Sequence, residues 1–258
     1  MSADAARAVA ARALPLVDLT NLDDACTPDD VAALCARAVT PHGAVAAVCL
    51  WPRFVAQAKT ALAGTGVKVA TVVNFPAGGD DTLAVVAETR QAVADGADEI
   101  DLVMPYRAFV AGRRGFAEEQ IRRVKAACGD VLLKVILETG EIGDPLLIHA
   151  ASDVAIGAGA DFIKTSTGKV AVNATPEAAE VMLTVIEEVR REHGGTVGFK
   201  AAGGIRTVAD AARYLALADR ILGANWVSAA TFRFGASGLL DALLAALDGR
   251  AADAGEGY

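Results

Sequence analysis

Aromatic residues, cysteines and histidines are scarce in this chain. Aromatic residues make up 5% of the 258 positions while hydrophobic residues make up 53%, so the core must be built largely from Ala, Val, Leu and Ile. The four cysteines form no Cys-x-x-Cys pair, and a chain of this length does not need disulfides, so we expect reduced thiols. The three histidines, at positions 42, 149 and 193, lack the spacing of zinc ligands, and we expect them in surface or capping roles.

The sequence also lacks a membrane segment, a secretion signal and a basic surface. Residues 1–12 carry charges and no apolar signal core, and the longest uncharged stretch, 38–52, is short and interrupted by Pro41 and Gly43. The formal net charge of −8 argues against nonspecific nucleic-acid binding, which needs a basic face. We therefore expect a soluble cytoplasmic protein that binds neither nucleic acid nor membrane. A phosphorylated ligand would need a locally positive pocket.

Two common catalytic motifs are absent. Residues 167–169, Thr-Gly-Lys, resemble the end of a nucleotide-binding P-loop, but that motif requires Gly at 163 and Ser or Thr at 170. Ile163 and Val170 stand there instead. No Gly-x-Ser-x-Gly sequence is present, so a serine acyl-transfer site of that type has no candidate nucleophile.

Short apolar runs alternate with helical patterns along nearly the whole chain. Runs that are apolar throughout, rather than alternating, are typical of parallel strands covered by helices. Eight such runs in a chain of this length predict one closed (β/α)8 TIM barrel, whose usual size is about 250 residues. The predicted strands are 15–20, 44–50, 67–75, 99–104, 131–138, 162–166, 197–201 and 231–236. The predicted helices between and after them are 28–39, 82–95, 116–128, 145–158, 176–192, 208–222 and 239–247.

These patterns predict a single α/β domain over residues 1–258. We expect a short N-terminal helix over 1–13, the barrel over 14–248, and a mobile tail over 249–258, which is small and polar and has no core pattern.

A short internal repeat places two charged residues at equivalent positions. Gly-Ala-Asp-Glu-Ile-Asp at 96–101 matches Gly-Ala-Asp-Phe-Ile-Lys at 159–164, and both segments read as a turn followed by a strand. The repeat predicts that Asp101 and Lys164 point into the barrel at one level.

Two lysines, Lys164 and Lys200, stand near the ends of neighbouring predicted strands. Buried ammonium groups are rare because desolvation disfavours the charged form. Schiff-base chemistry needs a neutral amine, and lowering the pKa of a free lysine, roughly 10.4, by about 3 units takes roughly 4 kcal/mol. Burial and a second nearby cation both act in that direction. The lysine pair therefore indicates amine catalysis, with Asp101 as the only acid among them and a candidate proton relay.

A purely structural interpretation is a buried Asp–Lys ion pair that braces the barrel. It would leave one charge unpaired, because two lysines outnumber one carboxylate. A further strand lysine, Lys134, has Glu138 four residues later on the same strand face, and we expect a supporting ion pair between them. We expect Cys49 to be a small core residue rather than a nucleophile.

The loops after the last three predicted strands could bind an anion. Glycines let backbone N–H groups approach an oxyanion, a helix N-terminus adds its dipole, and barrels often bind phosphate after strands seven and eight. Ordinary turn glycines are the alternative for any one loop, but three successive loops with two cations favour a phosphate site. The candidate residues are Gly168, Lys169, Gly203, Gly204, Arg206, Gly235 and Ser237.

The motifs together resemble the deoxyribose-phosphate aldolase family. The segments that carry the resemblance are Asp-Phe-Ile-Lys-Thr-Ser-Thr-Gly-Lys-Val-Ala-Val-Asn-Ala-Thr-Pro (161–176), Gly-Ala-Asp-Glu-Ile-Asp-Leu-Val (96–103), Val-Gly-Phe-Lys (197–200), Leu-x-Asp-Leu-Thr (16–20), Ala-Glu-Thr-Arg (87–90) and Leu-Leu-Lys-Val-Ile-Leu-Glu-Thr-Gly (132–140). The resemblance covers nearly the whole chain, and the 161–176 block is highly specific.

The resemblance implies a class I aldolase that reversibly cleaves 2-deoxy-D-ribose 5-phosphate to acetaldehyde and D-glyceraldehyde 3-phosphate, in deoxyribonucleoside catabolism. It implies that Lys164 forms the imine, that Lys200 lowers the pKa of Lys164, and that Asp101 relays protons. It implies no metal or organic cofactor. Accessory residues implied by the resemblance are Asp18 and Thr20 near the site and the C-terminal Tyr258, for which an uninvolved tail is the alternative.

Two departures from the family pattern stand out. Family members commonly read Lys-Pro-Ala-Gly-Gly after the second lysine, whereas this chain has Ala201 in place of the proline. We expect that change to loosen the loop. The family's paired serines after the last strand are Ser237 and Gly238 here, from which we expect weaker phosphate binding rather than lost activity.

Other functions stay open at this point. Another Schiff-base aldolase with a different acceptor aldehyde would share the same barrel, and a noncatalytic sugar-phosphate-binding barrel is a more distant alternative. Barrels of this size often dimerise, so a homodimer is one assembly to test.

Overall fold

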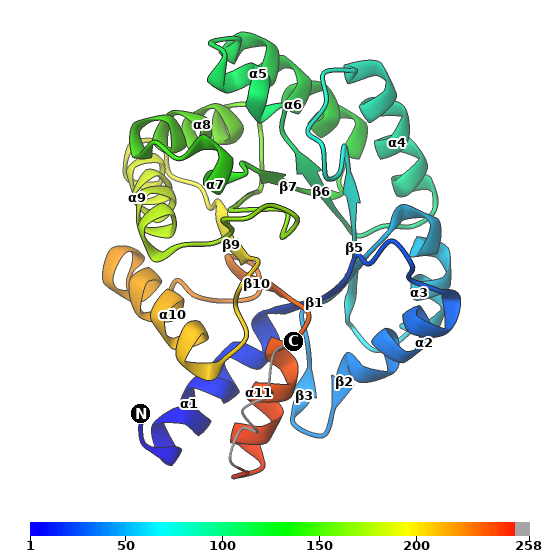
Figure 1. Ribbon diagram of the computed structural model, residues 1–258, viewed down its shortest axis with the longest axis vertical. Coiled ribbons are helices and arrows are strands. Elements are labelled where there is room, and N and C mark those ends of the chain that lie inside the picture. Colours follow the sequence, from blue (N-terminus) through cyan, green and yellow to red (C-terminus); the bar gives the residue numbers. More distant parts are fainter. Residues whose placement is uncertain (251–258) are drawn as a thin grey trace.

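Eight parallel strands close into a barrel in the computed structural model, which describes residues 1–250 (Figure 1). The barrel strands are β1 (Val17–Asn21), β4 (Ala47–Leu50), β5 (Lys68–Val73), β6 (Glu99–Val103), β7 (Leu132–Ile136), β8 (Phe162–Lys164), β9 (Gly198–Ala202) and β10 (Phe232–Ala236). Each pairs in parallel with both neighbours, and β10 pairs with β1 to close the ring. All eight overlap the predicted apolar runs, so the predicted fold class is confirmed.

Helices surround the strands on the outside of the barrel (Figure 1). They are α1 (Ala3–Ala13), α2 (Pro28–Arg37), α3 (Val55–Ala61), α4 (Thr82–Ala94), α5 (Tyr106–Val110), α6 (Arg114–Cys128), α7 (Thr139–Ile142), α8 (Pro145–Gly157), α9 (Pro176–His193), α10 (Val208–Leu222) and α11 (Leu239–Leu247). Three short helices, α3, α5 and α7, were not predicted, nor was the small hairpin of β2 (Val39–Thr40) and β3 (Gly43–Ala44).

Side-chain caps explain why the helix starts were readable from the sequence. Thr27 and Thr207 each accept a hydrogen bond from a backbone N–H three residues later, and Asp30 and Asp210 reciprocate at the cap backbone. Such capping boxes satisfy N–H groups that have no partner within the helix. The boundaries of α2 and α10 are therefore set locally.

Helix α1 precedes β1 in the chain and packs against α10 and α11 (Figure 1). Its bounds agree with the helix predicted over residues 1–13. Most of the predicted tail, including Tyr258, lies outside the described residues. No helix within residues 1–250 has the length and apolar character needed to span a membrane.

Candidate active site

Seven charged side chains are buried inside the barrel, although such groups are almost never fully buried unless paired. All come from barrel strands, and none of these residues is more than 5% exposed. They are Asp18 on β1, Glu99 and Asp101 on β6, Lys134 on β7, Lys164 on β8, Lys200 on β9 and Arg233 on β10. The barrel interior is thus a charged cluster covered by an apolar outer layer.

Asp101 is the centre of this cluster. Its Oδ2 accepts hydrogen bonds from Nζ of Lys164 at 2.7 Å and from Nζ of Lys200 at 2.8 Å, and its Oδ1 accepts one from Nζ of Lys134 at 2.8 Å. Lys164 and Lys200 are also direct neighbours in the register of β8 and β9. The inward placement of Asp101 and Lys164 that the repeat predicts is confirmed by this contact.

Asp18 and Glu99 add two further acids, so the expectation that Asp101 is the only acid beside the lysines is wrong. Asp18 binds Nζ of Lys200 at 2.5 Å through Oδ2 and the guanidinium of Arg233 at 2.6 Å through Oδ1. Glu99 binds Arg233 at 2.8 Å. The closed barrel brings Asp18, Glu99 and Arg233 together from strands that are far apart in the sequence.

Lys134 pairs with Glu99 at 2.6 Å and Asp101 at 2.8 Å. The predicted ion pair between Lys134 and Glu138 is therefore wrong. Residues four apart share a strand face, but β7 ends at Ile136 and the chain turns before Glu138, whose φ of 61° is left-handed. The lysine consequently finds its carboxylates on the neighbouring strand β6.

The cluster holds four basic groups and three carboxylates, so it is neutral when one lysine has lost its proton. Burial lowers the pKa of Lys164 and nearby Lys200 lowers it further, against the opposing pull of Asp101. Burial also acts to lower the pKa of Lys200 and of Lys134. Their carboxylate partners have the larger effect, so the pKa of each is raised. The three lysines hold the pKa of Asp101 well below its usual range despite its burial. Lys164 is therefore the amine most readily neutralised.

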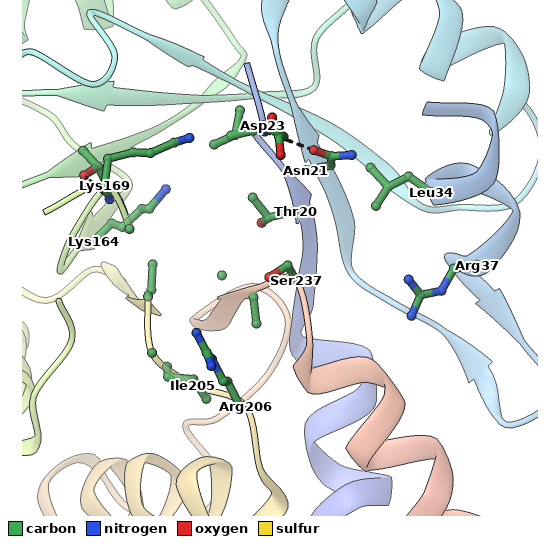
Figure 2. A pocket seen from close by; sticks show the side chains of 18 residues that line it. Thr20, Asn21, Asp23, Leu34, Arg37, Lys164, Lys169, Ile205, Arg206 and Ser237 are labelled. Atoms are coloured by element: carbon green, nitrogen blue, oxygen red, sulfur yellow. Dashed lines mark hydrogen bonds between the residues drawn. The ribbon is translucent and has the colours of Figure 1, made fainter. Parts of the chain in front are cut away.

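Lys164 is also the lysine of the cluster that faces a pocket (Figure 2). The pocket has a volume of about 550 Å³ and opens at the carboxyl ends of the strands, where barrel enzymes place their active sites. All seven residues of the predicted phosphate site line it, namely Gly168, Lys169, Gly203, Gly204, Arg206, Gly235 and Ser237. Thr20 lines it as well, and Asp18, two residues earlier on β1, is fully buried.

The loops around the pocket are held by specific contacts. Thr165 joins the ends of β8 and β9, because its Oγ1 accepts from the Ala202 N–H at 3.0 Å and donates to the Ala202 carbonyl at 3.2 Å. Gly203 has a φ of +85°, and a Cβ there would lie 2.7 Å from Cβ of Asn173. Only glycine fits this close approach without strain.

The two departures from the family pattern differ in their surroundings. Ala201 is fully buried within β9, so the missing proline lies in a strand and the expected loosening of a loop finds no support there. Gly238 caps α11 without a side-chain hydrogen bond, and a Cβ at this position would meet nothing within 4 Å. A hydroxyl is thus absent at a place where the structure has room for one.

Three residues at or beside the site, Arg233, Glu99 and Arg37, escaped the sequence analysis, and a fourth, Glu138, was expected only as an ion-pair partner of Lys134. Arg233 interrupts an apolar strand, and Glu99 lies two residues before Asp101 on the same face, so both carried a readable signal. Glu138 accepts a hydrogen bond from the Thr167 N–H at 3.2 Å, and burial raises its pKa. Arg37 lines the pocket from α2, and nothing in its local sequence marked it.

Cys49 is fully buried in an apolar cluster with Ala47, Ala70 and Val72, close to the charged lysines, and burial raises the pKa of its thiol. This environment agrees with its expected role as a core residue. Of the histidines, His42 pairs with Asp248 and His149 with Glu188, both on the outside of the barrel.

Comparison with known proteins agrees with this geometry. Residues 12–245 match the model of the DeoC/LacD family of aldolases. A deoxyribose-phosphate aldolase of Agrobacterium fabrum (strain C58) is 56% identical over 255 residues, covering 98% of this chain and 97% of that protein.

Two solved structures that this chain resembles are also described as deoxyribose-phosphate aldolases. The deoxyribose phosphate aldolase of Aeropyrum pernix, described as a unique tetramer, superposes with a TM-score of 0.73 at 25% identity, covering 93% of this chain and 91% of that one. A Toxoplasma gondii ME49 protein described as a candidate deoxyribose-phosphate aldolase gives a TM-score of 0.86 at 27% identity, covering 97% and 98% of the two chains. A family model matches most of the chain, and the Agrobacterium fabrum relative is 56% identical over nearly its full length. The chain therefore belongs to the DeoC/LacD aldolase family.

Proposed function

We propose that this aldolase reversibly cleaves 2-deoxy-D-ribose 5-phosphate to acetaldehyde and D-glyceraldehyde 3-phosphate through a Schiff base on Lys164. One observation carries the proposal: Lys164 faces the pocket as the one amine with a lowered pKa in a cluster that has one basic group more than it has carboxylates. The identity with the Agrobacterium fabrum deoxyribose-phosphate aldolase supports the choice of substrate.

The first step joins Lys164 to the open-chain sugar. Neutral Nζ attacks the C1 carbonyl carbon, and uptake of one proton with loss of water gives a protonated imine, which acts as an electron sink. The C3 hydroxyl then gives up its proton as the C2–C3 bond breaks. The bonding electrons move into the C1–C2 bond and neutralise the nitrogen, which leaves an enamine on Lys164 and releases D-glyceraldehyde 3-phosphate.

The second half of the cycle returns the enzyme. C2 of the enamine takes up a proton, and water hydrolyses the resulting imine to acetaldehyde and free Lys164. Asp101 is the proposed proton relay, directly or through a water, because its Oδ2 lies 2.7 Å from Nζ of Lys164. Lys200 keeps its proton between Asp101 and Asp18 and so disfavours protonation of Lys164.

The other predicted residues take supporting roles in this proposal. The seven glycine, serine and basic residues of the phosphate site hold the 5-phosphate at the mouth of the pocket. Thr20 donates to the Asp18 carbonyl at 2.8 Å and thereby fixes the end of β1. Tyr258 is proposed as an accessory proton donor, which a Tyr258→Phe variant tests through kcat.

The proposal places the enzyme in the cytoplasm, in deoxyribonucleoside catabolism, acting on a phosphorylated sugar and aldehydes without nucleic acid or membrane. It requires no metal or organic cofactor, since the lysine serves as the electron sink. We propose a homodimer as the assembly. Sedimentation equilibrium distinguishes it from a monomer and from a tetramer such as the one described for the Aeropyrum pernix relative.

Reductive trapping tests the function. Incubation with acetaldehyde and borohydride, followed by peptide mass mapping, is expected to place a reduced adduct on the peptide that contains Lys164. A folded protein that forms no adduct would support a noncatalytic sugar-phosphate-binding barrel instead. A product screen with several aldehydes separates this activity from that of a Schiff-base aldolase with another acceptor.

A further inference from the structure

One basic residue lines the pocket away from the loops in which a phosphate site was predicted. Arg37 is the last residue of α2, and together with Leu34, one turn earlier, it forms the wall of the pocket on that side. Figure 2 shows Arg37 on the α2 side of the pocket, with Ser237 lying between it and Lys169 in this view. The pocket therefore receives cationic side chains from different parts of the fold.

The position of Arg37 is set by a partner beside the pocket mouth. Its guanidinium donates to Oδ1 of Asp241 at 2.6 Å, and Asp241 lies in the first turn of α11. The two side chains are 46% and 71% exposed. An ion pair this exposed contributes little to stability. An anion that binds nearby can therefore compete for the guanidinium.

The start of α11 offers such an anion a binding place. The helix begins directly after Ser237 and Gly238, and Gly238 supplies no side chain to cap its first N–H groups. Uncapped N–H groups and the helix dipole both favour an anion there. Asp241 in the same turn would repel a phosphate, and Arg37 offsets that charge while adding a forked pair of donors suited to phosphate oxygens.

We propose that Arg37 binds the phosphate group of the substrate and sets the preference of the enzyme for phosphorylated over unphosphorylated sugars. The inference rests on the proposed function, because that function makes the substrate a sugar phosphate. A phosphate monoester carries about 1.5 to 2 negative charges at neutral pH. On a protein of net charge −8, this dianion depends on the local cations of the pocket.

The test compares Arg37→Gln with Asp241→Asn, which breaks the same ion pair but keeps the cation. For each variant, kcat/KM is measured with 2-deoxy-D-ribose 5-phosphate and with 2-deoxy-D-ribose. Arg37→Gln is expected to lower the ratio of the two values at least about 5-fold, the loss of one charge-assisted hydrogen bond. Asp241→Asn is expected to leave the ratio unchanged or to raise it. An equal fall in both variants would mean that the ion pair only braces the helices, and an unchanged ratio in Arg37→Gln would also overturn the proposal.

A double variant separates direct binding from mere neutralisation of Asp241. If Arg37 contacts phosphate, Arg37→Gln still lowers the ratio when introduced into Asp241→Asn, whereas full recovery in the double variant would contradict direct contact.

Inorganic phosphate provides a probe that needs no catalysis. Calorimetric titration of the full chain is expected to show at least about 5-fold weaker phosphate binding in Arg37→Gln than in the unmodified protein and in Asp241→Asn. Equal binding in all three proteins would overturn the role of Arg37, even in an active aldolase. Absence of cleavage by the unmodified protein would overturn the proposed function instead, and the two failures are therefore distinguishable.

Discussion

Lys164 and Lys200 donate hydrogen bonds to the same atom, Oδ2 of Asp101, at 2.7 and 2.8 Å. Two ammonium groups this close repel each other, and only Lys200 has a second carboxylate of its own, Asp18 at 2.5 Å. The shared oxygen therefore makes the two amines unequal: Lys200 keeps its proton and Lys164 gives its proton up. Variants at the two lysines should therefore behave differently.

Replacing the reactive amine should abolish turnover and leave the fold intact. Lys164→Met removes the nucleophile, so kcat/KM should fall by a factor on the order of 10⁴ or more. Because Lys164 is the uncharged member, the remaining three cations and three carboxylates still balance. The free energy of unfolding should fall by no more than about 1.5 kcal/mol, as for a volume-conserving change. Urea unfolding and steady-state kinetics check both points, and intact turnover would refute the Schiff base.

Replacing Lys200 should shift the pH dependence of the enzyme. Lys200→Met removes a cation that lowers the pKa of Lys164, so that pKa must rise and the cluster regains neutrality by protonating Lys164. The neutral fraction at pH 7 then falls, and we expect kcat/KM to drop about 100-fold or more and to recover as the pH rises. A pH–rate profile from pH 6 to 10 measures this. An acidic limb at the same pH in both proteins would argue against the role of Lys200.

A glycine on β10 makes room for Lys200. A Cβ at Gly235 would lie 2.9 Å from both Cε of Lys200 and Cβ of Ala202, and the lysine stem is held in place by its two carboxylates. Gly235→Ala should therefore destabilise the protein by about 1–3 kcal/mol, the usual range for overpacking, and displace the ammonium group. Gly238→Ala is the matched control, because a Cβ there meets open space. Similar stability and activity of the two variants would contradict this account.

Restoring a hydroxyl at the end of β10 should tighten phosphate binding. Gly238 has an ordinary φ of −101° and room for a side chain, so Gly238→Ser should be tolerated. One added hydrogen bond to phosphate, of about 1 kcal/mol, would lower KM for 2-deoxy-D-ribose 5-phosphate roughly 5-fold. KM is compared among the serine variant, Gly238→Ala and the unmodified enzyme. An unchanged KM in the serine variant would show that the missing hydroxyl does not limit phosphate affinity.

The barrel and its central residues Asp101, Lys164 and Lys200 were predictable because their sequence signals are local. Parallel strands buried on both faces read as apolar runs, and Thr27 or Thr207 mark helix starts by capping within a few residues. The repeat that ends in Asp101 and Lys164 needed only the regular period of strand and turn. The short helices α3, α5 and α7 carry no such periodicity, since their formation depends on packing against neighbouring elements.

The remaining parts of the site depend on long-range geometry. Glu99 and Arg233 meet across the barrel although they are 134 residues apart, and only the closed register brings them together. The spacing of Glu138 from Lys134 predicted a shared strand face, but the chain leaves the strand in a turn after β7, and Lys134 pairs with Glu99 instead. Arg37 sits at the end of an ordinary amphipathic helix, and its place in the pocket follows from how α2 packs on β1 and β4.

Direct titration of Lys164 tests the central claim. Lysines labelled with ¹³C at Cε are followed by NMR as a function of pH, with Lys164→Met used to assign the signal. The account predicts that Lys164 loses its proton well below the free lysine value of about 10.4, while Lys134 and Lys200 stay protonated past that pH. A Lys164 signal that titrates at or above the free lysine value in the folded enzyme would contradict it.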